Sequence, residues 1–109
     1  MGQLENSRLK LQTMLENLLE ANGKGKNVYY QPPEGLKMSY PCIVYSRQYL
    51  TKIAADNKNY LTNRQYRITY IDRSPISDVV DALLELDYCR YISHSVVDNL
   101  NHDTFEIYF

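Results

Sequence analysis

Apolar residues recur at the spacing of an α-helix in two parts of this 109-residue chain. In residues 3–22, one face carries Leu4, Leu11, Leu15 and Leu18, and Met14 and Leu19 widen it. Residues 75–86 follow a Ser74-Pro75 pair that suits a first helical turn, and they repeat Ile76, Val79, Val80, Leu83 and Leu84. We therefore expect two amphipathic helices. Gly23 should end the first, since glycine adopts the left-handed cap without strain, and residues 23–27 should form a flexible linker.

Apolar and polar residues alternate with the period of a β-strand in the rest of the chain. This pattern predicts a short strand over residues 28–30 and longer strands over residues 40–50, 63–72, 89–97 and 101–109. The polar residues 54–59 are expected to connect the second strand to the third. Connections within each pair of long strands are short, so both pairs should be antiparallel.

The order of the predicted elements is helix, short strand, two strands, helix, two strands. Together they predict an α+β fold, in which a mostly antiparallel sheet of four to five strands packs against two helices. The length of the chain favours one domain over residues 1–109, and we find no internal repeat.

Composition narrows the classes of function. The net charge is −1, whereas a nucleic-acid binder needs a strong excess of lysine and arginine. No apolar run reaches the roughly 18 residues of a membrane-spanning helix, and the start lacks the pattern of a signal peptide. Cys42 and Cys89 lie in apolar surroundings and match no zinc spacing, so we expect reduced core thiols in a protein kept in a reducing cytoplasm.

Tyrosine is the unusual residue type, with 11 tyrosines and no tryptophan. Its apolar ring and polar hydroxyl suit half-buried strands and protein interfaces. We expect contacts between subunits at exposed tyrosines, at a long loop over residues 51–63, and at the last residues of the chain. A modest basic patch is either a solvated face or a contact for nucleic acid or an acidic partner. The candidate interface residues are Tyr29, Tyr30, Tyr49, Tyr60, Asp56, Lys58, Arg64, Arg67, Tyr108 and Phe109.

Residues 98–103, Asp-Asn-Leu-Asn-His-Asp, gather the polar groups that most resemble a chemical site. His102, Asp98 and Asp103, with His94 across a hairpin, could converge on a metal and support a hydrolase, although their spacing matches no known ligand pattern. Aspartate and asparagine also bond their own backbone and tolerate left-handed geometry, so such clusters between strands mark turns. We favour a hairpin turn.

A nucleophile activated by histidine is poorly supported. Ser93 and Ser95 flank His94 in a predicted strand, so their side chains point away from it. Cys89 lies in an apolar run that should raise its pKa, and no glycine-rich nucleophile elbow is present. We therefore expect a protein that is not an enzyme, with no catalytic residue, cofactor or metal.

Several short markers lie in the last two thirds of the chain, residues 40–109. They are Tyr40-Pro41 at the start of a strand, the Asp56-Asn57-Lys58 segment, Ile71-Asp72-Arg73 before Ser74-Pro75, and the closing Asp98-Asn99-Leu100-Asn101-His102. With these markers the chain resembles the tail terminator proteins of tailed bacteriophages, also called tail-completion or head–tail joining proteins.

The resemblance implies an α+β subunit of a virion ring, typically a homohexamer, assembled in the host cytoplasm. Such a ring ends the tail tube and docks beneath the head connector, so its partners would be its own copies, the tail tube protein and neck proteins. DNA would pass through the lumen without specific binding. The resemblance carries over no catalytic residue. Alternative functions are another neck ring, such as a stopper or connector, and a small adaptor module of a non-phage system.

The end of the chain poses a separate question. Residues 104–109 form an aromatic strand pattern that continues to the last residue, whereas free ends normally fray unless they are tied into a sheet or a partner. Either the sheet of the same chain pairs this strand, or a neighbouring subunit does.

Overall fold

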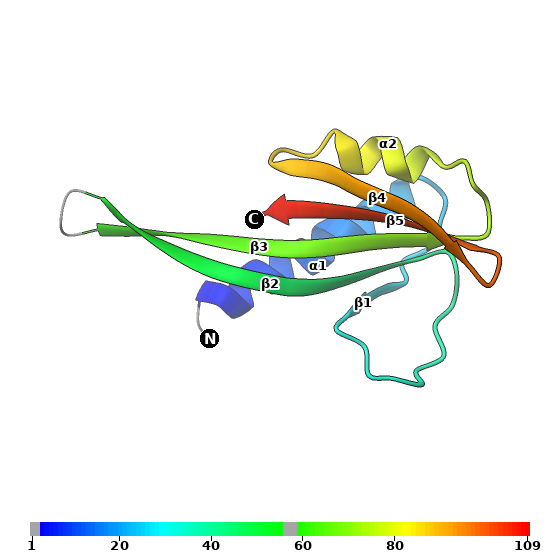
Figure 1. The fold of residues 1–109 in the computed structure, drawn as a ribbon, viewed down its shortest axis with the longest axis horizontal. Coiled ribbons are helices and arrows are strands. Elements are labelled where there is room, and N and C mark those ends of the chain that lie inside the picture. The colour runs from blue at the N-terminus through cyan, green and yellow to red at the C-terminus, as the bar shows by residue number, and fades with distance from the viewer. Residues whose placement is uncertain (1–2, 56–58) are drawn as a thin grey trace.

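The computed structural model describes the backbone of residues 3–55 and 59–109, and the side chains of residues 6–48 and 64–109. Within these ranges the chain forms an α+β fold with a five-stranded mixed sheet and two helices (Figure 1). The expected α+β class and mostly antiparallel sheet are confirmed. The elements are α1 (Gln3–Ala21), β1 (Val28–Tyr30), β2 (Cys42–Ala55), β3 (Asn59–Asp72), α2 (Asp78–Leu84), β4 (Cys89–Val97) and β5 (Leu100–Tyr108).

The strands lie in the order β1-β2-β3-β5-β4. β1 runs parallel to β2, and the other neighbours are antiparallel. β2 and β3 form one hairpin, and β4 and β5 form a second hairpin that packs β5 against β3. The last strand of the chain is therefore an inner strand, whereas β4 lies at the edge of the sheet.

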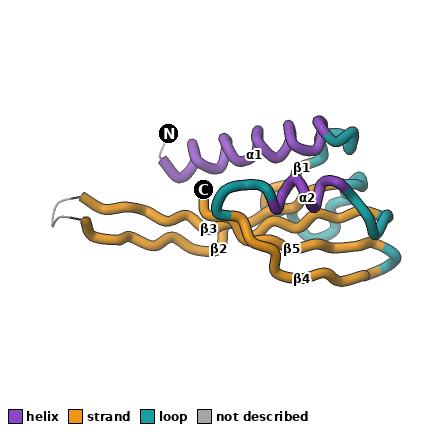
Figure 2. The backbone as a smooth tube through the Cα atoms, turned by 90° about the horizontal axis from the view of Figure 1, so that it is seen from above, coloured by secondary structure: helices purple, strands orange, loops and turns teal. Residues whose placement is uncertain are grey.

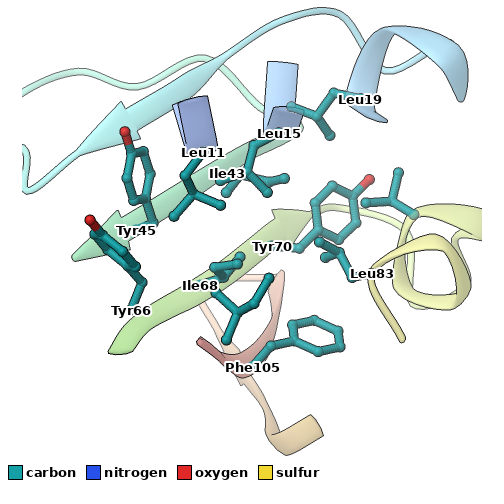
Figure 3. Close-up of a cluster of buried hydrophobic side chains, with 12 residues drawn as sticks. Leu11, Leu15, Leu19, Ile43, Tyr45, Tyr66, Ile68, Tyr70, Leu83 and Phe105 are labelled. Atoms are coloured by element: carbon teal, nitrogen blue, oxygen red, sulfur yellow. The ribbon is translucent and has the colours of Figure 1, made fainter. Parts of the chain in front are cut away.

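α1 and α2 cover the same face of the sheet (Figure 2). The leucines of α1 at helical spacing, Leu11, Leu15 and Leu19, are fully buried. They meet the alternate residues of the strands that point toward the helices (Figure 3). In the described ranges, no helix covers the opposite face of the sheet (Figure 2). The sheet and α2 contribute to this core Ile43, Tyr45, Tyr66, Ile68, Tyr70, Val79, Leu83, Phe105 and Ile107.

Three of the largest buried side chains are tyrosines, and each has a partner for its hydroxyl. The Tyr45 hydroxyl donates to Gln12 Oε1 of α1, and the Tyr70 hydroxyl donates to Asp72 Oδ2 over 2.6 Å. The Tyr66 hydroxyl reaches Ser7 Oγ of α1 at 3.5 Å. Tyrosine thus serves the boundary between helices and sheet, where its ring is buried and its hydroxyl still finds a polar group.

The end of α1 agrees with the sequence prediction. Gly23 has φ +70°, the left-handed conformation that glycine adopts without strain. Its N–H donates to the Glu20 carbonyl over 3.0 Å, and the Lys24 N–H donates to the Leu19 carbonyl over 2.9 Å. These are the two hydrogen bonds of a Schellman motif, and they satisfy carbonyls that the helix leaves free.

The predicted loop over residues 51–63 is wrong, because residues 51–55 and 59–63 are strand. Of the connection predicted over residues 54–59, Ala54, Ala55 and Asn59 are also strand, and residues 56–58 lie outside the described residues. β2 continues to Ala55 and β3 begins at Asn59, and the two strands stay paired throughout, from Thr51 with Asn63 to Ala55 with Asn59. Backbone pairing of the hairpin continues although the sequence has lost its clear apolar alternation. We call residues 50–55 and 59–63 the arm, because they extend past the end of β5 (Figure 1).

The second helix is shorter than the pattern predicts. It begins at Asp78, with Ser77 as the N-cap whose hydroxyl accepts from the Val79 N–H over 3.1 Å. Ser74 instead bonds the backbone of Ile76, in a turn that precedes the helix. Ile76, expected in the core, is 83% exposed as a result.

The C-terminal strand is paired within its own chain. β5 lies between β3 and β4, and the last residue is tied on two sides. The Phe109 N–H donates to the Arg64 carbonyl over 3.0 Å, and Ser7 Oγ of α1 donates to the Phe109 carbonyl over 3.2 Å. The Tyr108 N–H donates to the Tyr88 carbonyl over 3.2 Å. The end of the chain therefore stabilises the fold.

Deleting Tyr108 and Phe109 should lower the free energy of unfolding by about 2–4 kcal/mol, because three hydrogen bonds are lost at about 1 kcal/mol each together with some packing. Urea unfolding followed by circular dichroism measures this. Phe109→Ala keeps the backbone bonds and should cost less. If the urea midpoint of unfolding is unchanged after the deletion, Tyr108 and Phe109 do not stabilise the fold.

Candidate functional site

The acidic and amide cluster at residues 98–103 is built around a hairpin turn. Val97 of β4 pairs with Leu100 of β5, so Asp98 and Asn99 form a two-residue loop. Their φ angles are +52° and +64°, the geometry of a type I′ turn. Aspartate and asparagine tolerate this left-handed conformation better than most residues. The predicted hairpin turn is confirmed at Asp98 and Asn99, whereas residues 100–103 already belong to β5.

The residues of the metal hypothesis do not converge. His94 lies across from Asp103 on the helix-bearing face, whereas His102 lies on the opposite face because side chains alternate along β5. His94 Nε2 lies 3.2 Å from Asn101 Oδ1, and His102 Nδ1 lies 3.1 Å from the Leu100 carbonyl. In the part of the chain that the structure describes, no group of three histidine, cysteine or acidic residues is placed to hold a metal.

Neither cysteine has the environment of a reactive thiol. Both are free, with Cys42 buried and Cys89 partly buried. Burial raises the pKa of the Cys42 thiol to about 12 and that of Cys89 to about 11. Both thiols are therefore protonated near neutral pH and are poor nucleophiles.

A buried polar cluster surrounds Asp72 at the end of β3. The carboxylate accepts hydrogen bonds from the Tyr70 hydroxyl over 2.6 Å and from the Ser74 N–H over 3.1 Å, and its Oδ2 lies 3.7 Å from Lys24 Nζ. Asn101 Nδ2 donates to the Asp72 carbonyl over 3.3 Å. The cluster thus joins the segment after α1, the turn before α2, and β5. Its polar groups are bonded to each other, which makes it a structural tie.

The charge state of Asp72 follows from the same contacts. Burial raises its pKa, but hydrogen bonds from Tyr70 and from the Ser74 backbone, together with the Lys24 ammonium, outweigh burial and lower the pKa below its usual value. Burial and the hydrogen bond to this carboxylate raise the pKa of the Tyr70 hydroxyl. Asp72 is therefore the charged acceptor and Tyr70 the neutral donor.

Among the residues whose side chains are described, β4 is the most exposed regular element. In the described sheet it pairs with β5 on one side and with no strand on the other. All residues from Arg90 to Val97 are exposed, among them Val96 at 59% and Val97 at 54%. A shift of register between Tyr91 and Ser93 marks a bulge. An edge strand of this length, without proline, offers unpaired backbone groups to another chain.

Beside β4, α2 and its flanking residues add apolar and acidic groups to the same side of the molecule. Ile76 before the helix is 83% exposed, and Tyr88 after it is 81% exposed. The acidic residues of this segment are also exposed, and residues 74–88 contain no lysine or arginine; they are Asp78, Asp81, Glu85 and Asp87. We call α2 with Ile76 and Tyr88, together with β4, the α2–β4 edge.

The face of the sheet opposite the helices carries a self-paired polar group around Glu106, whereas Cys42 and Ile71, farther along the same face, are buried. Glu106 of β5 lies between two arginines, 3.4 Å from Arg67 and 3.1 Å from Arg90, and its Oε2 accepts from Gln65 Nε2 over 2.6 Å. Thr69 and Thr104 hydroxyls lie 3.5 Å apart across the strands. Polar groups of this kind suit a solvated sheet face.

The candidate interface residues whose side chains are described do not form one surface. Tyr29 and Tyr30, expected to be exposed, are half-buried in β1. The Tyr30 ring lies 4.9 Å from the Tyr45 ring, and the Tyr29 hydroxyl accepts from the Ser39 N–H over 3.1 Å. These side chains are held by the fold because β1 packs beside the core.

The other candidates divide into four groups. The first group lies where β5 ends beside β3 and consists of Arg64, Tyr108 and Phe109. The second is Arg67, which pairs with Glu106 on the face of the sheet opposite the helices. Tyr49 and Tyr60 belong to β2 and β3, but their side chains are outside the described residues. Asp56 and Lys58 lie wholly outside the described residues.

The α2–β4 edge was not predicted from the sequence. The helical pattern placed Ile76 in the buried stripe of a helix that in fact begins later, at Asp78. Ser77 followed by Asp78, a capping residue before an acidic first turn, was the signal that could have placed the start correctly. The exposure of Val96 had no signal, because a central strand and an edge strand can share one apolar pattern.

Comparison with known proteins gives no assignment. Neither models of protein families nor curated proteins match this chain. In the described ranges, no helix combines the length and the hydrophobicity that crossing a membrane requires.

The turn predicts opposite effects of two substitutions at one position. Asn99→Gly should leave the stability unchanged or raise it slightly, because Asp-Gly is a preferred type I′ pair. Asn99→Val should cost about 1–2 kcal/mol, because a β-branched residue is strained at positive φ. Thermal unfolding of the two variants measures the difference. Equal melting temperatures would argue against this turn geometry.

The lowered pKa of Asp72 predicts that the stability of the fold depends on pH. Its pKa is lower in the fold than the value of about 3.9 in an unfolded chain, so the carboxylate stabilises the fold above that pH, and this is lost as the pH falls through the folded pKa. Asp72→Asn should cost about 2 kcal/mol near pH 7. The difference from wild type should shrink as the pH falls below about 4.

Urea unfolding at several pH values checks this prediction. Asp87→Asn, at an exposed position, serves as the control and should change the free energy of unfolding by less than about 0.5 kcal/mol. If Asp72→Asn lowers the free energy of unfolding by the same amount at every pH, its effect does not come from the charge of the carboxylate.

Proposed function

We propose that this chain is a structural subunit of the neck or tail of a bacteriophage, forming a ring that ends the tail tube and joins it to the head connector. The proposal rests on the resemblance over residues 40–109 to tail terminator proteins. Its site of action would be the assembled virion. Its partners would be its own copies, typically six in a ring, the tail tube protein and the neck proteins.

The observation that best supports this proposal is that the chain exposes two different surfaces suited to protein contacts. One is the arm, a two-stranded ribbon that extends past the body of the sheet (Figure 1). The other is the α2–β4 edge, with an unpaired strand and exposed apolar residues. Contacts between unlike surfaces of identical subunits are the kind that close into rings.

The proposal assigns no catalysis, cofactor or metal to the chain. The state of the candidate nucleophiles and metal ligands supports this part of the proposal. The thiols of Cys42 and Cys89 have raised pKa values, and Asp98 belongs to a turn. Among the described side chains, every buried nitrogen and oxygen atom has a hydrogen-bond partner. These groups are engaged in the fold.

The charge of the chain suits a conduit for DNA. Affinity for phosphates comes from accumulated lysine and arginine, and here the two signs nearly balance, with a net charge of −1. A ring of such subunits would let DNA pass without holding it. The same balance suits a stopper or connector ring of the neck, so the binding partner has to distinguish these functions.

Binding to tail tubes tests the proposed function. The purified chain, mixed with assembled tail tubes of the phage that would carry it, should cosediment with the tubes and form rings at their ends in electron micrographs. Binding to the head connector alone would identify another neck ring. A chain that stays monomeric at high concentration and binds neither partner would contradict the proposal. A monomer that forms rings on tube ends agrees with it.

A further inference from the structure

We propose that the arm of one copy of this chain binds the α2–β4 edge of the next copy, where it adds its strands to the neighbouring sheet. The contact requires only two copies of the chain. Its consequence, a ring, rests on the proposed function. Both surfaces are present in every subunit, so each copy would give one arm and receive another.

The edge supplies the accepting strand. β4 spans nine residues, Cys89–Val97, and the backbone N–H and C=O groups on its outer side have no strand partner in the described sheet. An extended segment that adds to such an edge gains main-chain hydrogen bonds along its whole length. The exposed apolar side chains beside the strand would be covered at the same time; they are Ile76, Leu84, Tyr88, Ile92, Val96 and Val97.

The arm supplies the donated strand. The pairing of β3 with β5 begins at Gln65, and β1 pairs with β2 only at residues 43–45, so the arm has only its own two strands in the described sheet. An isolated two-stranded hairpin is marginally stable in water, and a third strand or a packed face is what stabilises it. The arm thus lacks the same kind of neighbour that β4 lacks.

The charges of the two surfaces are opposite. The arm carries one basic residue, Lys52, and no acidic residue, and Arg47 and Arg64 lie at its base. The α2–β4 edge carries four exposed acidic residues in the segment 74–88 and one basic residue, Arg90, which pairs with Glu106. Opposite charges on two surfaces steer them together and disfavour wrong partners.

Charge also argues against the simplest alternative, in which β4 of one copy pairs with β4 of another. That symmetric contact would bring the acidic α2 segments of both copies to the same interface, where they would repel each other. It would also use the same patch on both subunits and therefore end at a dimer. An arm-to-edge contact joins opposite charges and can propagate into a closed ring.

Two variants that each lose one half of the contact provide the test. In the arm-shortened variant, residues 51–63 are replaced by Asn-Gly, which closes the hairpin after the pair Leu50 and Arg64. In the edge-blocked variant, Ile92→Lys and Val96→Lys place positive charges on β4, where they repel a basic arm and block strand addition. Leu36→Lys, at an exposed apolar position in the loop before β2, is the matched control.

The arm-shortened variant keeps an edge, and the edge-blocked variant keeps an arm. Each should be monomeric alone, and their mixture should form a one-to-one complex, seen by native mass spectrometry and by titration of the isotope-labelled arm-shortened variant in NMR. Resonances of β4 and α2 should shift, and the complex should weaken as salt is raised. The control Leu36→Lys should bind the arm-shortened variant like wild type. If the double substitution unfolds the chain, Val96→Lys alone replaces it.

Two results would overturn the proposal. One is a mixture that stays monomeric, with no shifts in β4 or α2, at concentrations near 1 mM, where even weak binding is detected. The other is an arm-shortened variant that dimerises alone, which would show that β4 pairs with itself. Tail-tube binding separates this contact from the proposed function. If both variants form rings on tail tubes, the arm-to-edge contact is refuted and the proposed function is not. If the two variants form a one-to-one complex but the wild-type chain never binds tubes, the proposed function is refuted and the contact is not.

Discussion

The helical layer of this protein is shorter than the sheet that it covers. α1 has 19 residues, about 28 Å at the helical rise per residue, whereas β2 and β3 have 14 residues each, about 46 Å in extended form. α2 has seven residues beside the nine of β4. Where the helices end, the strands continue uncovered. The arm, the exposed β4 and the elongated shape of 51 × 27 × 25 Å are all consequences of this difference in length.

The tyrosines of this chain are divided between the buried core and the exposed surface. Their number favours protein interfaces, yet Tyr45, Tyr66 and Tyr70 are buried beneath the helices, with their hydroxyls bonded within the fold. Tyr88 and Tyr91, by contrast, are exposed on the α2–β4 edge. The same side chain serves both purposes, because its ring excludes water and its hydroxyl tolerates either a polar neighbour or solvent.

Local chemistry made much of the fold predictable. Gly23 ends α1 because glycine adopts positive φ, and Asp98-Asn99 turns the last hairpin for a related reason. The bounds of β4 were predicted correctly as residues 89–97. The prediction failed where two local signals competed. Ser74-Pro75 and Ser77-Asp78 both resemble the start of a helix, and the structure uses the second pair.

By itself, the sequence determined the α+β class, the confirmed turns and the leucine face of α1, because each depends on the conformational preferences of neighbouring residues or on a short repeat. Only the tertiary structure decided that β5 is an inner strand and β4 an edge, and that the hairpin of β2 and β3 extends into an arm. Strand order and exposure depend on which distant segments pair through their backbones. The alternation within each strand does not tell which strands pair, so the α2–β4 edge was visible only in three dimensions.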